Sequence, residues 1–78
     1  HANIENLFKM FDMFESEAKS LVVKQISLPA YDQCLKASHV FNILDSRGAI
    51  SVAQRAEYIG RIREITKAAA AIWIDTQV

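Results

Sequence analysis

The residues that could carry out chemistry are few in this sequence, and their spacing fits no common catalytic or binding motif. Gly48 and Gly60 are the only glycines and lie twelve positions apart, so no glycine-rich loop can surround a phosphate group. His1, His39 and Cys34 do not have the spacing of a zinc site, and neither HExxH nor CxxC occurs. We therefore predict no catalytic, cofactor-binding or metal-binding residue in this chain.

Each of these side chains also has an ordinary structural use. Cys34 is expected to be a small buried apolar residue, because a nucleophilic cysteine needs a base and an electropositive pocket, and the sequence indicates neither. His39 is expected at the surface or in a structural hydrogen bond. The serines near the middle of the chain lack the strand-to-helix elbow of a hydrolase nucleophile. These serines are Ser27, Ser38, Ser46 and Ser51.

A set of basic residues in the second half of the chain suggests a binding function. The set consists of Arg47, Arg55, Arg61, Arg63 and Lys67. A guanidinium group is a planar fork of donors that suits phosphate and carboxylate groups. However, Glu57 and Glu64 are expected to pair with Arg61 and Lys67, and Arg63 is rotated by about 200° from Arg61 on a helix. Two interpretations stay open: a solvated or salt-bridged surface, or a contact with RNA or an acidic partner.

Three aromatic residues and one isoleucine are candidates for contacts with a partner protein. They are Tyr31, Tyr58, Trp73 and Ile74. Ile72, Trp73 and Ile74 point in three successive directions on a helix, and a small monomer can hardly cover all of them. Core packing is the alternative and the commoner use of an aromatic residue at helical spacing. Arg47, beside Gly48, could instead tie its loop to a helix end or to a neighbouring domain.

These residues would be positioned by helices, because apolar residues recur every three or four positions from the start of the chain. We predict a first helix over residues 4–24, with Asn3 as its N-cap and Glu5 in its first turn. Glu15 is expected on the solvent side, paired with Lys19 one turn later. The apolar face contains Ile4, Leu7, Phe8, Phe11, Phe14, Ala18, Leu21 and Val22.

Two further helices are predicted over residues 29–45 and 52–75. Pro29 suits a helix start, Gly48 suits the left-handed residue after a helix end, and Ser51 with Gln54 has the spacing of a capping box. The expected apolar face of the second helix is Tyr31, Cys34, Leu35 and Phe41, extended by Ala37, Val40 and Leu44. That of the third is Val52, Ala56, Ile59, Ile62, Ile65, Ala69 and Ile72. The sequence thus predicts an all-α, three-helix bundle.

Length and composition limit the possible classes of protein. The chain has 78 residues, enough for one small domain, and nine basic against nine acidic residues, so no net field attracts nucleic acid or an anionic membrane. The second connection is too long for a DNA-reading helix-turn-helix, no apolar run approaches the ~20 residues of a membrane span, and a lone cysteine suits the cytoplasm. The 51% apolar content and the start without methionine lead us to expect a fragment of a longer chain, with a partner surface missing.

A series of motifs through the middle of the chain gives a family resemblance. LPAYD, LKASH, FN-x-LD, R-x-AIS and R-x-x-YI-x-RIR follow one another from Leu28 to Arg63. In these motifs the chain resembles the C-terminal helical region of the α subunit of bacterial glycyl-tRNA synthetase, of the two-subunit type. The resemblance covers nearly the whole chain, so it is far more specific than any single short motif.

The resemblance implies a place in a class II aminoacyl-tRNA synthetase, a ligase that joins glycine to tRNA(Gly) with ATP and Mg. The catalytic domain, an antiparallel-sheet domain that binds ATP and glycine, would precede this region and is absent here, so residues 1–78 are expected to be a non-catalytic helical domain without a cofactor. The implied partners are the β subunit, a second α subunit and tRNA(Gly). The first hypothesis is that the domain packs on the catalytic domain and supports α–β assembly near Trp73 and the outer side of the second helix. The alternatives are an RNA-contacting helix that uses Arg55, Arg61, Arg63 and Lys67, or a purely structural interaction bundle.

Overall fold

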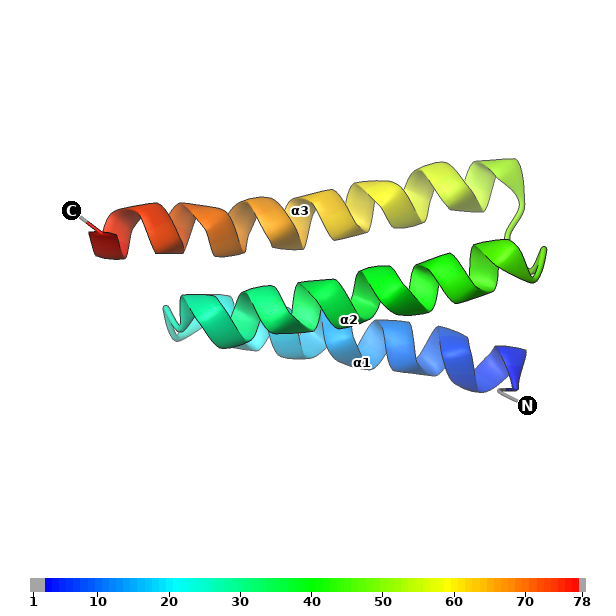
Figure 1. Cartoon of the computed structure of the whole chain (residues 1–78), viewed down its shortest axis with the longest axis horizontal. Coiled ribbons are helices and arrows are strands. Elements are labelled where there is room, and N and C mark those ends of the chain that lie inside the picture. Colours follow the sequence, from blue (N-terminus) through cyan, green and yellow to red (C-terminus); the bar gives the residue numbers. More distant parts are fainter. Residues whose placement is uncertain (1–2, 78) are drawn as a thin grey trace.

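The computed structural model describes residues 3–77, with side chains for residues 3–75, and consists of three antiparallel helices. These are α1 (Ile4–Val23), α2 (Ser27–Ser46) and α3 (Val52–Gln77). Each helix runs in the direction opposite to that of the preceding one (Figure 1). No strand occurs in the described part of the chain, so the predicted all-α bundle is confirmed. His1, which the sequence excluded as a metal ligand, lies outside the described residues.

The helix starts follow from local side-chain chemistry. Asn3 caps α1, because its Oδ1 accepts hydrogen bonds from the backbone N–H groups of Glu5 and Asn6. Ser51 and Gln54 form the predicted capping box: the Ser51 N–H donates to Gln54 Oε1 at 3.0 Å, and the Gln54 N–H donates to Ser51 Oγ at 3.1 Å. α2 begins two residues earlier than predicted, at Ser27, because Pro29 is still within the first turn, where no N–H needs a partner within the helix.

The two helix ends before the connections have the same backbone geometry. After α2, the N–H groups of Gly48 and Ala49 donate to the carbonyls of Asp45 and Leu44, and Gly48 has a left-handed φ of 68°. After α1, Gln25 occupies the corresponding position with φ 60°, and Ile26 makes the second bond of the motif. Both connections are therefore closed turns that bring consecutive helices together, although only one of them has the glycine that usually marks such a turn.

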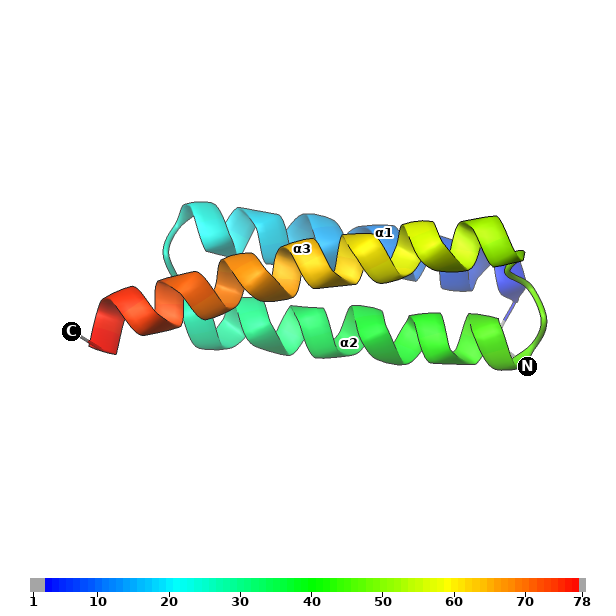
Figure 2. The ribbon, with the colours of Figure 1, turned by 90° about the horizontal axis from the view of Figure 1, so that it is seen from above.

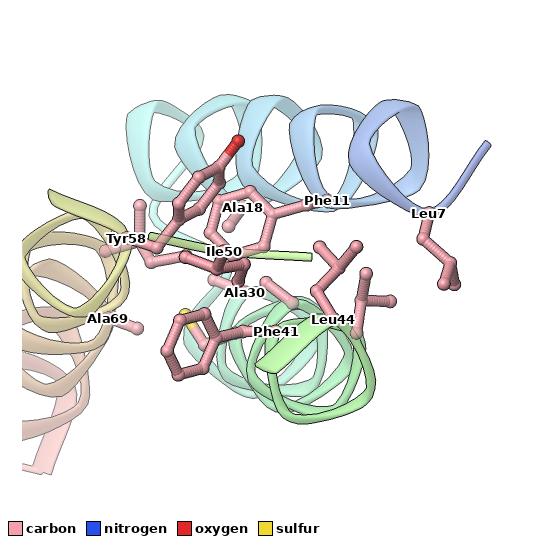
Figure 3. Packing of buried hydrophobic residues seen from close by; sticks show 13 residues of the cluster. Leu7, Phe11, Ala18, Ala30, Phe41, Leu44, Ile50, Tyr58 and Ala69 are labelled. Atoms are coloured by element: carbon pink, nitrogen blue, oxygen red, sulfur yellow. The ribbon is translucent and has the colours of Figure 1, made fainter. Parts of the chain in front are cut away.

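The core lies along the axis where the three helices meet (Figure 3). Its buried apolar members are Leu7, Phe11, Ala18, Ala30, Cys34, Ala37, Val40, Phe41, Leu44, Ile50, Tyr58, Ile65 and Ala69. The predicted faces need three corrections. Tyr31 and Leu35 of α2 are exposed, and so are Val52 and Ile59 at the start of α3, because Tyr58 and Arg61 set the inward side there. Glu15 is buried rather than solvated.

The third helix crosses the other two obliquely. Seen from above, α3 crosses in front of α1 and α2, follows α1 with its first half, and reaches past the start of α2 with its last turns (Figure 2). α1 packs most extensively on α2, and α3 contacts α2 more than α1. The molecule is thus a rod of 43 × 22 × 15 Å whose C-terminal end is formed by α3 alone.

Candidate interaction site

Arg61 joins α3 to α1 through the hydrogen bonds and ring contacts of its guanidinium group. Its Nε donates to Glu15 Oε2 at 2.9 Å, and its Nη2 donates to Glu15 Oε1 at 2.5 Å and to Asp12 Oδ1 at 2.8 Å. The guanidinium carbon also lies 4.8 Å from the ring centroids of both Phe11 and Tyr58. A bidentate carboxylate contact and two cation–π contacts on one group make Arg61 a structural link between the helices.

The electrostatics of this link explain why Glu15 can be buried. Hydrogen bonds from Arg61 lower the pKa of Glu15 below its ordinary value of 4.5 although burial opposes this, and the carboxylates raise the pKa of Arg61. Both groups are therefore charged at neutral pH. Arg61 pairs with Asp12 and Glu15 rather than with the expected Glu57, and the charge of Lys19 also helps to lower the pKa of Glu15 without an ion pair within 4 Å.

The basic residues that the sequence grouped together divide into two kinds. Arg61 is engaged inside the bundle, and Arg55 donates to Asp45 Oδ1 from both Nε and Nη2, at 3.0 and 2.6 Å, which ties the start of α3 to the end of α2. Arg47 also has an interaction partner. Only Arg63 and Lys67, one turn apart on α3, are exposed and form no ion pair with the side chains of residues 3–75. An RNA contact through four cations of α3 is accordingly not favoured.

Tyr58, one of the four interface candidates, lies in the core. Its ring makes an edge contact with Phe11 at 4.7 Å between centroids and further contacts with Phe8 at 5.9 Å and Phe41 at 6.3 Å. Figure 3 shows Tyr58 pointing from α3 toward Phe11 of α1, with Phe41 extending from α2 toward the side of α3. This residue therefore joins the three helices and leaves the other candidates, Tyr31, Trp73 and Ile74, on the surface.

Two of these three residues line an apolar groove where α2 begins and α3 ends. It is lined by Ser27, Leu28 and Tyr31 of α2 and by Ala69, Ala70 and Trp73 of α3. The volume is about 250 Å³, and Leu28, Tyr31 and Trp73 keep 63%, 45% and 44% of their surface exposed. Ile74 follows immediately and is 62% exposed. We call this feature the Trp73 groove.

A second, shallower hollow lies on α3 itself and shares Ala70 with the Trp73 groove. Its lining is Ile59, Ile62, Arg63, Thr66, Lys67 and Ala70. The two exposed cations named above therefore stand beside exposed apolar surface. We call this feature the basic strip.

Comparison with known proteins identifies the family. All of residues 1–78 match the family model described as "Glycyl-tRNA synthetase alpha subunit". The chain belongs to this family. It is also 49% identical over 77 residues to "Glycine--tRNA ligase, chloroplastic/mitochondrial 2" of Arabidopsis thaliana, a match that covers 99% of this chain and 7% of that protein. The resemblance to glycyl-tRNA synthetase is thereby confirmed; the C-terminal position and the bacterial type are not.

Within this synthetase family member, the remaining candidates for chemistry have structural positions. Cys34 is buried as predicted, and burial raises the pKa of its thiol. His39 is exposed beside an apolar hollow between α1 and α2, as predicted for a surface histidine. Among the described residues, no group of three or more His, Cys, Asp or Glu side chains could hold a metal ion. No helix within that part of the chain has the length and apolar character needed to cross a membrane.

The sequence did not predict the link from Arg61 to Glu15. Glu15 is four residues after Phe11 and one turn before Lys19, which is a normal position for a surface pair, while Arg61 lies forty-six residues further along the chain. One signal was present: Phe11, Glu15 and Ala18 have helical spacing, so Glu15 interrupts an apolar stripe. A charged residue in such a stripe requires a partner from another element.

Proposed function

We propose that this chain is a non-catalytic helical module of a glycine–tRNA ligase, in which it supports the association of the catalytic domain and the β subunit through the Trp73 groove. The proposed parent enzyme attaches glycine to tRNA(Gly) with ATP and Mg, which bind outside these residues. Its partners would be the β subunit, a second α subunit and, through the assembly, tRNA(Gly). The observation that carries the proposal is an apolar groove of about 250 Å³ with two exposed aromatic walls at the projecting end of α3.

The chemistry of the groove supports protein docking. Aromatic side chains at the centre of an interface contribute most of its binding energy, and Tyr31 and Trp73 stand on opposite helices with their rings partly in water. Ala70, a small and exposed residue of the lining, lets another polypeptide approach the backbone of α3 closely. Burying the exposed parts of these side chains would recover hydrophobic free energy of about 25 cal/mol for each Å² removed from water.

The proposed absence of catalysis in this module has a direct test. Glycine-dependent exchange of pyrophosphate into ATP reports formation of glycyl adenylate, and it requires the catalytic domain. We expect no exchange by the 78-residue chain alone and normal exchange when the whole α subunit is assayed. Exchange by the isolated chain would contradict the assignment. A cytoplasmic location belongs to the same proposal; the Arabidopsis relative is by its name chloroplastic or mitochondrial.

The docking function is tested by the double variant Trp73→Ala and Ile74→Ser in the whole α subunit. Because both side chains are partly exposed, the fold should be retained, while association with the β subunit, measured by analytical ultracentrifugation, should weaken at least about tenfold. The matched control is Val23→Ser with Val52→Ser, which removes two valines that are 82% and 83% exposed outside the groove. Equal association constants for the two double variants would refute the placement.

A further inference from the structure

The basic strip contains two cations that no carboxylate of residues 3–75 approaches within 4 Å. Arg63 and Lys67 are one helical turn apart, and like charges at this spacing destabilise a helix. Four other cations of the described part, Lys9, Lys36, Arg55 and Arg61, each have a carboxylate within 4 Å. Glu64, which the sequence offered as a partner for Lys67, is not within this distance of it. Two positive charges thus remain available beside the apolar surface of Ile59 and Ile62.

The strip has the shape that a helix would fit. Its lining residues recur every three or four positions from Ile59 to Ala70, so they follow one side of α3 for about 16 Å, or three turns. At 3.6 residues per turn the cations lie on one edge, Ile62 lies on the other, and Ile59, Thr66 and Ala70 lie between them. Ala70 connects the strip with the Trp73 groove. A straight apolar face with charges along its edge is the surface on which an amphipathic helix packs.

We propose that the basic strip binds an amphipathic helix of the β subunit, with carboxylates on that helix facing Arg63 and Lys67. The proposal rests on the docking function above and names the chemistry of the partner. The complementary helix presents apolar residues at i, i+3, i+4 and i+7 to Ile59, Ile62 and Ala70. Its Asp or Glu residues lie on the edge that meets the two cations, and these charges fix its direction and register.

A nucleic-acid strand fits the strip less well. Proteins that bind single strands stack bases on aromatic side chains and follow the phosphates with many cations, but the lining contains no aromatic residue and only two cations. Arg55 and Arg61, which could extend the positive charge along α3, are held by Asp45, Asp12 and Glu15. The exposed Ile59 would also contact the phosphate backbone without compensation. These features favour an acidic helix over RNA.

Photocrosslinking in the assembled enzyme identifies the occupant. The photoreactive amino acid p-benzoylphenylalanine at position 59 of the whole α subunit lies in the strip, since Ile59 is 40% exposed there. With the β subunit and tRNA present, we expect a crosslink to one peptide of the β subunit that has two or more Asp or Glu residues on one helical face; a crosslink to another part of the α subunit would contradict the proposal. A crosslink to tRNA, a crosslink to a second copy of this chain, or the absence of any crosslink would each overturn the proposal.

Charge reversal then tests the electrostatic part. The double variant Arg63→Glu and Lys67→Glu should weaken association with the partner at least tenfold at low salt, and Lys substitutions at the crosslinked carboxylates should restore it. The matched control, Lys9→Glu with Lys24→Glu, makes the same change in net charge on exposed residues of α1 and its C-cap. Equal effects of the two reversals would overturn the inference. If Trp73→Ala with Ile74→Ser weakens association while the reversal does not, the inference fails and the docking function stands; if neither does, both fail.

Discussion

The two halves of α3 use their side chains in opposite ways. The first half carries Tyr58 and Arg61 into contact with α1, and both are covered by aromatic rings or carboxylates. The second half has a run of four alanines, of which Ala69 is buried and Ala70 and Ala71 are exposed, and its large residues Trp73 and Ile74 remain exposed. One helix therefore stabilises the bundle at one end and exposes apolar side chains at the other. Substitutions at Tyr58 or Arg61 should accordingly lower the stability of the chain, whereas substitutions at Trp73 or Ile74 should weaken its binding to a partner.

The largest effect is expected from Tyr58→Ala. This change removes a buried ring that contacts three phenylalanines and leaves a cavity, so the free energy of unfolding should fall by about 3–5 kcal/mol. Urea unfolding followed by circular dichroism measures it. Tyr58→Phe keeps the ring and should cost less than about 1 kcal/mol. If Tyr58→Ala cost no more than Tyr58→Phe, the first half of α3 would not be the stabilising half.

Arg61→Ala should have the next largest effect. It leaves Glu15 buried without its bidentate partner and removes two cation–π contacts, so we expect a loss of about 2–3 kcal/mol in the same measurement. Arg63→Ala is the matched control, because Arg63 is two residues away, exposed and unpaired with the described side chains; it should change stability by less than about 0.5 kcal/mol. Equal losses for the two arginines would contradict the structural role of Arg61.

The helix boundaries could be predicted from the sequence, because their signals are local. Asn3, Ser51 with Gln54, and Gly48 marked helix boundaries through side-chain and backbone requirements that act within four residues. The period of the apolar residues gave the number and type of the helices. Gln25 carries no such signal, because a glutamine with left-handed φ is chosen by the closed turn and by the packing of α1 on α2 rather than by its own preference.

The rotation of each helix about its axis was harder to predict. The expected face of α3 counted Val52, Ala56 and Ile59 as core because they are apolar, yet Tyr58 and Arg61 point inward. An arginine counts as polar in any periodic pattern, although its guanidinium can lie on two aromatic rings once carboxylates neutralise it. The same long-range contacts decide which of the candidate residues remain for a partner, and only the structure shows that selection. The residues that remain are Tyr31, Trp73, Ile74, Arg63 and Lys67.

The pH dependence of stability tests whether Arg61 holds Glu15 in its ionised form. Because the folded-state pKa of Glu15 lies below its unfolded value of 4.5, the stabilisation that it provides is complete above that pH and is lost as the pH falls through the lower folded value. Wild-type chain should therefore lose its advantage over Glu15→Gln as the pH is lowered from 7 toward 3. Denaturant titrations of both proteins at several pH values give this difference. A gap that stays constant across this range would mean that Glu15 is not held ionised by Arg61.

The smallest effect on stability is expected at the other end of α3, from Ile74→Ser. This side chain is 62% exposed and follows the last contacts with α2, so the free energy of unfolding of the chain alone should change by less than about 0.5 kcal/mol. In the whole enzyme, the same substitution should weaken association with the partner, because the exposed methyl groups would be buried there. Ile65→Ser, two turns earlier and 2% exposed, is the matched contrast, since it places a hydroxyl in the core and should cost several-fold more stability. If the two isoleucines behaved alike in unfolding, the last turns of α3 would belong to the bundle core and would offer no surface to a partner.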